Sequence, residues 1–385
     1  MTNGTPNLTS PTNFAQIETP AVLLDEAKMM ANLEFMQDLA DRNSVALRPH
    51  IKTHKSVEIG RKQIELGSSG ITVATIDEAL VFLNAGFTSI TVARPVVSSQ
   101  KWNQILSVKS HRKVDIRVVV DSEEGIRIAS EQAEFHKQEV GLFLKIDVGL
   151  HRCGLMPNDQ NINKLAVMIH ENEYLDFRGL LSHAGHVYGS KSVTDATEIA
   201  ENERQIMVVL RDDLLKAGLP VPEISVGATP AVLATDCFDG ITEIRPGNYV
   251  FLDLLPTRVG VARVYDVALS VLATVISKNS QYLVTDAGSK TLSSDTGVHG
   301  MTSDQGFGLA YPVEHFLDAD YEMIVEKVSE EHSMLTHTNC TLSIGAKIRV
   351  VPVHSCPVAN LARSYVVLSP GGLVTWPVDA AGRSK

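Results

Sequence analysis

One lysine among imidazole and basic side chains is the strongest candidate for chemistry in this chain. The β-rich run Val45–Lys52 lies within the letters VALRPHIKTHK, which place Lys52 near its end. A lysine at the end of a strand can lie beside a cavity of low dielectric, where its pKa falls and its amine can form a Schiff base with an aldehyde cofactor. Lys55 is the competing candidate, and a solvated lysine capping the strand is the alternative interpretation. Strand geometry favours Lys52.

Two glycine-containing turns could bind an anion. They are GATP, residues 227–230, and RPGNY, residues 245–249. Gly227 allows a close approach of the backbone, and Pro230 suits the first turn of a helix, so N–H groups and the Thr229 hydroxyl would face a phosphate. Such turns are common in other proteins. In barrels of parallel strands, however, phosphate sites favour the loops after the last two strands, which is where these two turns fall.

A third pattern could bind a metal ion. In VPVHSCP, residues 351–357, an extended segment would point His354 and Cys356 the same way, toward one divalent metal. Two protein ligands do not form a closed structural zinc site, but they suit an open site completed by water and substrate. Glu330, Glu331 and His332 are candidate neighbours, although a solvated turn is the simpler interpretation of SEEH.

The order of the β-rich runs predicts the frame that positions these side chains. Between residue 44 and about residue 245, such runs alternate with amphipathic helical stretches (77–85, 123–137 and 195–217 among them), which indicates parallel strands joined by helices. Eight strands close a TIM-type (β/α)8 barrel, whereas a doubly wound open sheet usually has about six. Active sites of barrels lie at the C-terminal ends of the strands, so the polar side chains should share one rim. The predicted strands are Val45–Lys52, Gly70–Ala74, Ser89–Ala93, Asp115–Val120, Leu142–Asp147, Phe177–His183, Glu223–Val226 and Thr242–Ile244.

Beyond Phe251 the pattern predicts a C-terminal antiparallel β domain, because runs rich in Val, Ile, Leu and Thr are broken by Gly, Pro, Asn and Ser. We expect an N-terminal arm and strand over residues 1–25, the cofactor-binding barrel over 26–255, and the β domain with its metal site over 256–385. The predicted strands of this domain are Ala268–Ser277, Gln281–Asp286, Leu342–Val353 and Ser364–Leu368, and Thr19–Leu24 could join them.

Composition excludes several classes of protein. The chain has 385 residues, 44% of them hydrophobic, and a formal net charge of −11 without a long basic run, so nucleic acid and anionic membranes are poor partners. It has no apolar stretch of about 18 residues and no signal-peptide pattern at its start. Cys153, Cys237, Cys340 and Cys356 lack the spacing of a disulfide framework, so we expect a cytoplasmic protein.

Taken together, the motifs resemble the D-threonine aldolase and D-serine dehydratase family. That family belongs to the fold-type III, alanine-racemase-like enzymes of pyridoxal phosphate. The resemblance runs from about Thr19 to Arg383, with the motifs in the family's order. It implies pyridoxal 5′-phosphate, a divalent metal ion (zinc or manganese), a small D-amino acid as substrate, and a homodimer. The segments that carry it are RPHIKTHKS, DVGLHRCG, SHAGHVYG, VGATPA, EIRPGNYVFLD, DAGSKT, SEEH and HSCPVANL.

The resemblance also implies roles for individual residues. Lys52 would form the Schiff base and act as base at the substrate's α-carbon, and His354 would serve catalysis as a metal ligand together with Cys356. Arg152 would lie near the ring oxygen of the cofactor, and Tyr188 near its pyridine nitrogen. The residues implied for the phosphate are Gly227, Thr229, Gly247, Asn248 and Tyr249.

The expected function is that of a lyase for D-β-hydroxy-α-amino acids. We favour a D-threonine aldolase, which yields glycine and an aldehyde; the alternative is a D-serine or D-3-hydroxyaspartate dehydratase, which yields a 2-keto acid and ammonia. Cys356 and the GATP turn match the branch with a cysteine ligand, which includes dehydratases, whereas several bacterial aldolases have aspartate as second ligand. More distant alternatives are an amino-acid racemase, which needs no metal, and a non-catalytic carrier of the cofactor.

Overall fold

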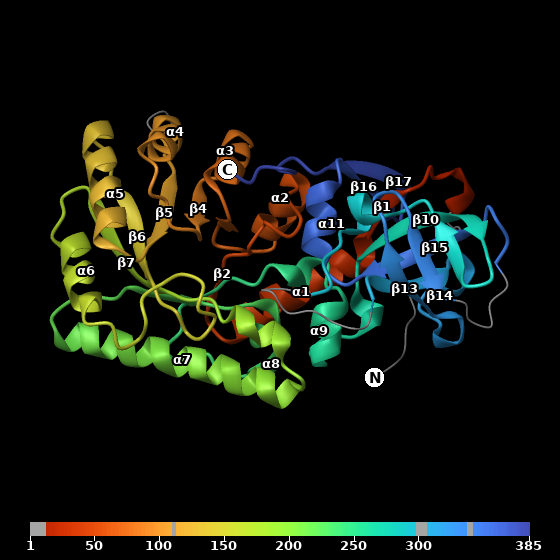
Figure 1. Ribbon diagram of the computed structural model, residues 1–385. Helices are drawn as coiled ribbons and strands as arrows, with labels where there is room; N and C mark the ends of the chain where they lie inside the picture. Colours follow the sequence, from red (N-terminus) through yellow and green to blue (C-terminus); the bar gives the residue numbers. More distant parts are fainter. Residues whose placement is uncertain (1–12, 110–112, 298–305, 337–341) are drawn as a thin grey trace. The chain divides into compact units, whose positions relative to one another are not determined.

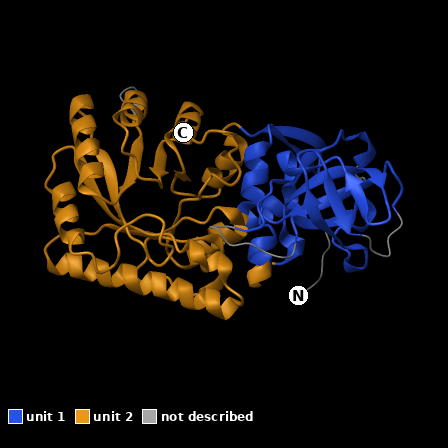
Figure 2. Cartoon of the chain, viewed as in Figure 1, with its two compact units in different colours: residues 1–32, 250–257, 263–378 blue, residues 33–249, 258–262, 379–385 orange. Residues whose placement is uncertain are grey.

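The computed structural model describes residues 13–109, 113–297, 306–336 and 342–385 (Figure 1). The chain divides into two compact units, which Figure 2 shows in two colours. The barrel unit comprises residues 33–249, 258–262 and 379–385, and the β unit comprises residues 1–32, 250–257 and 263–378. In the described ranges, no helix is both long and apolar enough to cross a membrane.

The barrel unit is built on eight parallel strands in the order β2-β9-β8-β7-β6-β5-β4-β3. The two end strands also meet, because His50 forms a parallel bridge with Thr72 and the Thr72 N–H donates to the carbonyl of Pro49 at 2.8 Å. The predicted TIM-type barrel is therefore confirmed. Its strands are β2 (Ala46–Leu47), β3 (Ile71–Val73), β4 (Ser89–Val92), β5 (Asp115–Val120), β6 (Val140–Lys145), β7 (Leu175–Leu181), β8 (Glu223–Val226) and β9 (Glu243–Ile244).

The first predicted strand was too long. It ends at Leu47 rather than at Lys52. Pro49 has no N–H to donate on the β3 side, although the His50 N–H still donates to the carbonyl of Pro246 at 3.0 Å. The Ile51 N–H still donates to the carbonyl of Thr72 at 2.9 Å, but the Ile51 carbonyl then accepts the N–H of Lys55 at 2.8 Å. Lys52 consequently lies on a tight turn beyond the strand.

Helices follow the strands as the amphipathic pattern predicted. In α7, the buried positions recur every three or four residues, which gives one face toward the sheet. The Ser192 side chain accepts the N–H of Asp195 and caps this helix, and Ser122 caps α5 in the same way. The helices are α1 (Glu26–Arg42), α2 (Val57–Glu65), α3 (Ile76–Asn84), α4 (Ser99–Lys109), α5 (Glu123–His136), α6 (Asn161–His170), α7 (Val193–Lys216), α8 (Thr229–Ala234) and α9 (Leu254–Val259).

Ion pairs cross the barrel interior near the starts of the strands. Arg48 Nε lies 2.6 Å from Glu243 Oε2, and both side chains are almost completely buried. Arg117 NH1 lies 2.7 Å from Glu223 Oε2. Because β5 and β8 are not neighbours in the sheet, the Arg117 contact spans the interior. Charged pairs thus occupy this part of the interior, while Val119, Phe143 and Leu181 of β5, β6 and β7 form a buried apolar cluster further along the strands.

The β unit contains a nine-stranded sheet in the order β11-β14-β13-β12-β15-β10-β1-β16-β17. An additional pairing of β11 with β10 closes six of these strands into a ring. Its pairings are antiparallel except that of β1 with β16, so the predicted antiparallel β domain is confirmed. The strands are β1 (Ala21–Asp25), β10 (Leu269–Lys278), β11 (Tyr282–Thr285), β12 (Gly308–Pro312), β13 (Met323–Val328), β14 (Ser333–Thr336), β15 (Lys347–Pro352), β16 (Ser364–Ser369) and β17 (Gly372–Pro377); the unit's short helices are α10 (Ser289–Leu292) and α11 (Ser355–Leu361).

Candidate active site

The turn after β2 separates the two candidate lysines. Lys55 has a left-handed backbone (φ 52°), and its buried Nζ forms an ion pair with Glu78 beneath the turn. Such a conformation costs about 1–2 kcal/mol for a residue with a Cβ, and the ion pair helps to hold it. Lys52 is half-buried, and its backbone N–H donates to His50 Nδ1 at 3.4 Å. The amine of Lys55 is thus committed to a carboxylate.

The RPGNY turn packs directly against this lysine turn. A Cβ on Gly247 would lie 2.7 Å from the carbonyl oxygen of His50 and 3.0 Å from Thr53 Oγ1. Carbon atoms cannot come so close to either group without displacing it. Glycine is therefore required here by contact with the turn that carries Lys52, and the two sequence motifs meet at one rim of the barrel.

The predicted phosphate residues are joined by hydrogen bonds within the barrel unit. Thr229 Oγ1 accepts the backbone N–H of Tyr249 at 3.1 Å, which ties the GATP turn to the RPGNY turn. The Tyr249 hydroxyl accepts from Gln63 Nε2 at 2.9 Å, and burial raises its pKa. Asn248 is buried, and Gly227 has φ 115°, a conformation that favours glycine. The Tyr249 hydroxyl is therefore buried, and its O–H remains able to donate a hydrogen bond.

Cationic groups gather around two imidazoles at this rim. Burial, followed by the charge of Lys52, lowers the pKa of both His50 and His183 well below the ordinary value. The charge of Arg152 also lowers both pKa values, although the Arg152 side chain itself is exposed. Lys145, the last residue of β6, is buried, and burial lowers its pKa to about 7. Sequence analysis missed Lys145, because the apolar run that it ends looks like an ordinary buried strand.

The rim has a surplus of basic side chains that an anionic ligand would balance. Glu203 is a buried acid near Lys145 and Arg245, but its Oε1 already accepts from Ser182 Oγ at 2.6 Å and from the Ala184 N–H at 3.1 Å. Within the described residues, Arg245 Nε is buried without a hydrogen-bond partner. An unpaired buried donor is costly. A phosphate or carboxylate would suit this surplus of positive charge.

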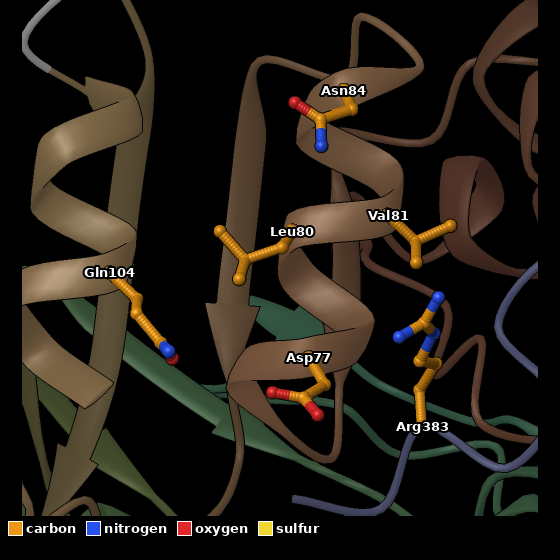
Figure 3. A pocket seen from close by; sticks show the side chains of 6 residues that line it. All are labelled: Asp77, Leu80, Val81, Asn84, Gln104 and Arg383. Carbon is orange, nitrogen blue, oxygen red and sulfur yellow. The ribbon is translucent and has the colours of Figure 1, made fainter. Parts of the chain in front are cut away.

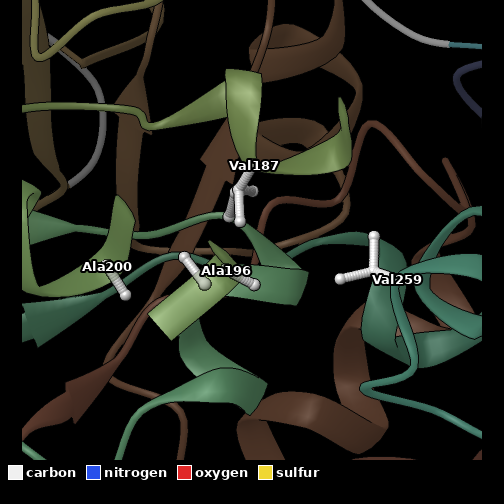
Figure 4. Close-up of a cluster of buried hydrophobic side chains, with 6 residues drawn as sticks. Val187, Ala196, Ala200 and Val259 are labelled. Atoms are coloured by element: carbon white, nitrogen blue, oxygen red, sulfur yellow. The ribbon is translucent and has the colours of Figure 1, made fainter. Parts of the chain in front are cut away.

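Tyr188 lies on a short 3-10 helix, η2 (Gly185–Gly189), that follows β7. Val187 of this helix belongs to a cluster of buried apolar side chains that includes Ala196 and Ala200 of α7 and Val259 (Figure 4). The Tyr188 ring packs on the same apolar cluster. Small alanine side chains let α7 approach closely, so the cluster fixes η2 and, with it, the position of Tyr188.

The predicted metal ligands lie in the β unit. β15 ends at Pro352, and the extended segment expected here is interrupted: His354 is the N-cap of α11, and Cys356 lies in that helix's first turn. His354 Nδ1 lies 2.9 Å from Asp295 Oδ2. Burial opposes protonation of His354, but the charge of Cys356 and the hydrogen bond to Asp295 raise its pKa to about 10.

The chemistry of this pair fits a divalent cation. An imidazole and a thiolate are both good zinc ligands, and a carboxylate on the second nitrogen of a metal-binding histidine orients the ring. Sequence analysis missed Asp295, which is 59 residues from His354. In the ranges that the structure describes, no group of three such side chains could hold a metal ion. Glu330 and Glu331 instead pair with Lys290 at the surface, at 2.8 Å each.

A cavity of about 240 Å³ lies elsewhere in the barrel unit (Figure 3). It is lined by residues of α3 and α4 and by one residue near the C-terminus, and none of its lining residues belongs to the candidate site. Its lining residues are Asp77, Leu80, Val81, Asn84, Gln104 and Arg383.

Comparison with known protein families gives two matches that follow one another along the chain. Residues 24–254 match the family model described as alanine racemase, N-terminal domain, and residues 268–368 match that of a serine dehydratase domain. The chain is 34% identical to D-threo-3-hydroxyaspartate dehydratase of Delftia sp., over 94% of this chain and 97% of the relative. It is 32% identical to D-serine dehydratase of Dictyostelium discoideum (92% and 94% covered) and 29% identical to D-threonine aldolase of an Arthrobacter species (97% and 95% covered).

Solved structures agree with these matches. The structure of the Delftia dehydratase superposes with a TM-score of 0.88 at 32% sequence identity, covering 96% of this chain and 99% of that one. A cysteine-to-alanine variant of the same dehydratase, described as metal-free, superposes equally well, with a TM-score of 0.88 at 31% identity and the same coverage.

Proposed function

Because the chain belongs to the alanine-racemase-like family of pyridoxal phosphate enzymes that includes D-serine dehydratase and D-threonine aldolase, we propose that it is a metal-dependent lyase for D-β-hydroxy-α-amino acids. The resemblance found in the motifs is confirmed by these matches. The observation that carries the proposal is the arrangement at the barrel rim, where the RPGNY turn packs against the turn that carries Lys52.

The residues at the rim fit pyridoxal phosphate. Lys52 would bond to the aldehyde, and the GATP and RPGNY turns, with Gly227, Thr229, Gly247 and Asn248, would hold the phosphate. When bound, the cofactor supplies an electron sink for charge that develops at the substrate's α-carbon. Lys52 would take the proton from that carbon. Arg152 and Tyr188 would orient the ring of the cofactor.

His354 and Cys356 would hold a divalent cation, zinc or manganese. Such a cation supplies a Lewis acid for the β-hydroxyl group of the substrate. Asp295 would keep the His354 ring in one orientation, so that Nε2 is the nitrogen left for the metal.

Of the two candidate reactions, we favour elimination of the hydroxyl group over carbon–carbon cleavage. Two relatives, 34% and 32% identical to this chain, are named as dehydratases, and Cys356 matches the branch of the family with a cysteine ligand, which includes dehydratases. The expected products are a 2-keto acid and ammonia, from D-threo-3-hydroxyaspartate or D-serine. The retro-aldol cleavage favoured from the motifs stays the second candidate, because relatives named as aldolases also match almost the whole chain, at 29% and 27% identity.

Product analysis tests this proposal. The purified protein, with pyridoxal phosphate and Zn²⁺ or Mn²⁺, is incubated separately with D-threo-3-hydroxyaspartate, D-serine and D-threonine. Keto acid and ammonia that disappear after EDTA would establish the dehydratase. Glycine that disappears after EDTA would establish the aldolase instead. Formation of neither product, with racemisation that survives EDTA, would refute the lyase.

We further propose that the protein acts as a homodimer in the cytoplasm. Cys153, Cys237 and Cys356 are free cysteines among the residues described, and Cys340 lies outside the described residues. Sedimentation equilibrium of the purified protein would test the dimer.

A further inference from the structure

We propose that residues 379–385 position the turn that carries Lys52, and that Asp379 is the main positioning residue. This segment belongs to the barrel unit, although the strand that precedes it, β17, belongs to the β unit. The proposal rests on the proposed role of Lys52. Asp379 touches neither substrate nor cofactor in this account, and it acts only through the backbone of the lysine turn.

The first contact is a helix cap supplied from a distant part of the chain. α2 begins at Val57, and its N-cap, Ser56, makes no capping hydrogen bond with its side chain. Asp379 Oδ2 accepts the Val57 N–H at 2.7 Å instead. A carboxylate at this place satisfies a free N–H of the first helical turn and is favoured by the helix dipole. Asp379 therefore fixes the end of the turn that begins at Ile51.

The second contact holds the strained residue of the turn. The Ala380 N–H donates to the carbonyl of Lys55 at 2.9 Å, and Ala380 is fully buried. Lys55 is the residue with the left-handed backbone, and only three positions separate it from Lys52. The backbone of Lys55 is thus held by residue 380 while its side chain is held by Glu78.

The rest of the segment is anchored to α3. Thr75 Oγ1 donates to the carbonyl of Arg383 at 2.8 Å, and the Asp77 N–H donates to the carbonyl of Lys385 at 3.2 Å. Figure 3 shows Arg383 beside Val81 of α3. Glu78, the partner of Lys55, is on the same helix. The segment, α3 and the lysine turn therefore form one continuous bracket on the barrel.

Loss of this bracket should loosen the turn before it unfolds the barrel. A turn that samples several conformations must be ordered when the cofactor bonds to Lys52, and this ordering weakens apparent affinity. The bracket would therefore act on cofactor affinity and on the rate of the reaction, with less effect on substrate KM.

The test compares Asp379→Ala with Asp379→Asn in the full-length protein. We expect Asp379→Ala to speed amide hydrogen exchange in residues 50–58 about fivefold and to raise the Kd for pyridoxal phosphate by a similar factor, the usual effect of losing a helix cap. Asp379→Asn should restore both, since its amide oxygen can accept the same N–H. Ser122→Ala is the matched control, because it removes the α5 cap on the Gly125 N–H, at 3.2 Å, away from the lysine turn.

Wild-type exchange in residues 50–58 of Asp379→Ala would overturn the proposal. Equal changes in Asp379→Ala and Ser122→Ala would also overturn it, because they would indicate a general loss of stability. Failure of the proposed function is a separate result. A wild-type protein that binds no pyridoxal phosphate would refute the role of Lys52. Hydrogen exchange of the cofactor-free protein would still report whether Asp379 holds the turn.

Discussion

Replacement of Gly247 by alanine tests whether the RPGNY turn positions the lysine turn. The new Cβ would lie 2.7 Å from the His50 carbonyl oxygen and 3.0 Å from Thr53 Oγ1. Carbon contacts are favourable only at about 3.5 Å or more, so the lysine turn must move by about 0.5–1 Å. Overpacking of this kind costs about 1–3 kcal/mol. A shift of about 1 Å near a reacting group can lower the rate about a hundredfold.

We therefore expect Gly247→Ala to lower the free energy of unfolding by about 2 kcal/mol and kcat/KM by about ten- to a hundredfold. Urea unfolding measures the first effect, and steady-state kinetics with a cofactor titration measures the second. Gly371→Ala is the control, because its Cβ would meet no atom within 4 Å. A Gly247→Ala variant with the stability, cofactor affinity and rate of Gly371→Ala would refute the assigned contact.

Three further predictions concern the buried charges and the metal pair. Glu243→Gln leaves the buried Arg48 without its counter-charge and should lower the free energy of unfolding by about 3 kcal/mol in urea. Between about pH 7 and 10.5, Lys145 binds a proton in the unfolded chain but not in the folded one, so the free energy of unfolding of the cofactor-free protein should rise with pH, by up to ~1.4 kcal/mol per unit. Lys145→Met should remove this slope. His354→Ala should abolish Zn²⁺ binding in chelator competition, and Asp295→Asn should weaken it about tenfold or more.

Each of these predictions has a clear contrary result. Glu131→Gln removes an ion pair whose side chains are both more than half exposed, and it should leave the free energy of unfolding unchanged. A Glu243→Gln variant that loses no more stability than Glu131→Gln would contradict the buried network. A slope with pH that persists in Lys145→Met would assign the titration to another group. Undiminished Zn²⁺ affinity in His354→Ala would place the metal elsewhere.

The barrel was predictable because its signal is local. Each parallel strand is short, buried and apolar, and each helix repeats its buried positions every three or four residues, as α7 does. β1 could also be anticipated, since Thr19–Leu24 is apolar and stands outside the eight strands. The end of the first strand was wrong by five residues, because Pro49 offers no N–H on the β3 side and the chain turns at Ile51.

β12, β13, β14 and β17 went unpredicted, although β13 pairs with β14 and β17 with β16, each next to it in the chain. Gly308, Glu326, Lys327 and Gly372 interrupt the apolar runs of β12, β13 and β17, and β14 has only four residues.

Other features depend on contacts that no local pattern contains. Lys145 also went unpredicted, because its importance arises from burial beside Arg245 and Arg152. Asp295 and Asp379 have partners 59 and 322 residues away. The motifs indicated which residues could react, but not what holds them in place.

Reduction of the cofactor-loaded protein with borohydride tests the central claim most directly. Borohydride converts a Schiff base into a stable secondary amine, so the cofactor stays on the lysine that carried it. Peptide mapping by mass spectrometry should find pyridoxal phosphate on Lys52 alone. A label on Lys55 or Lys145, or no label on any lysine, would contradict the account.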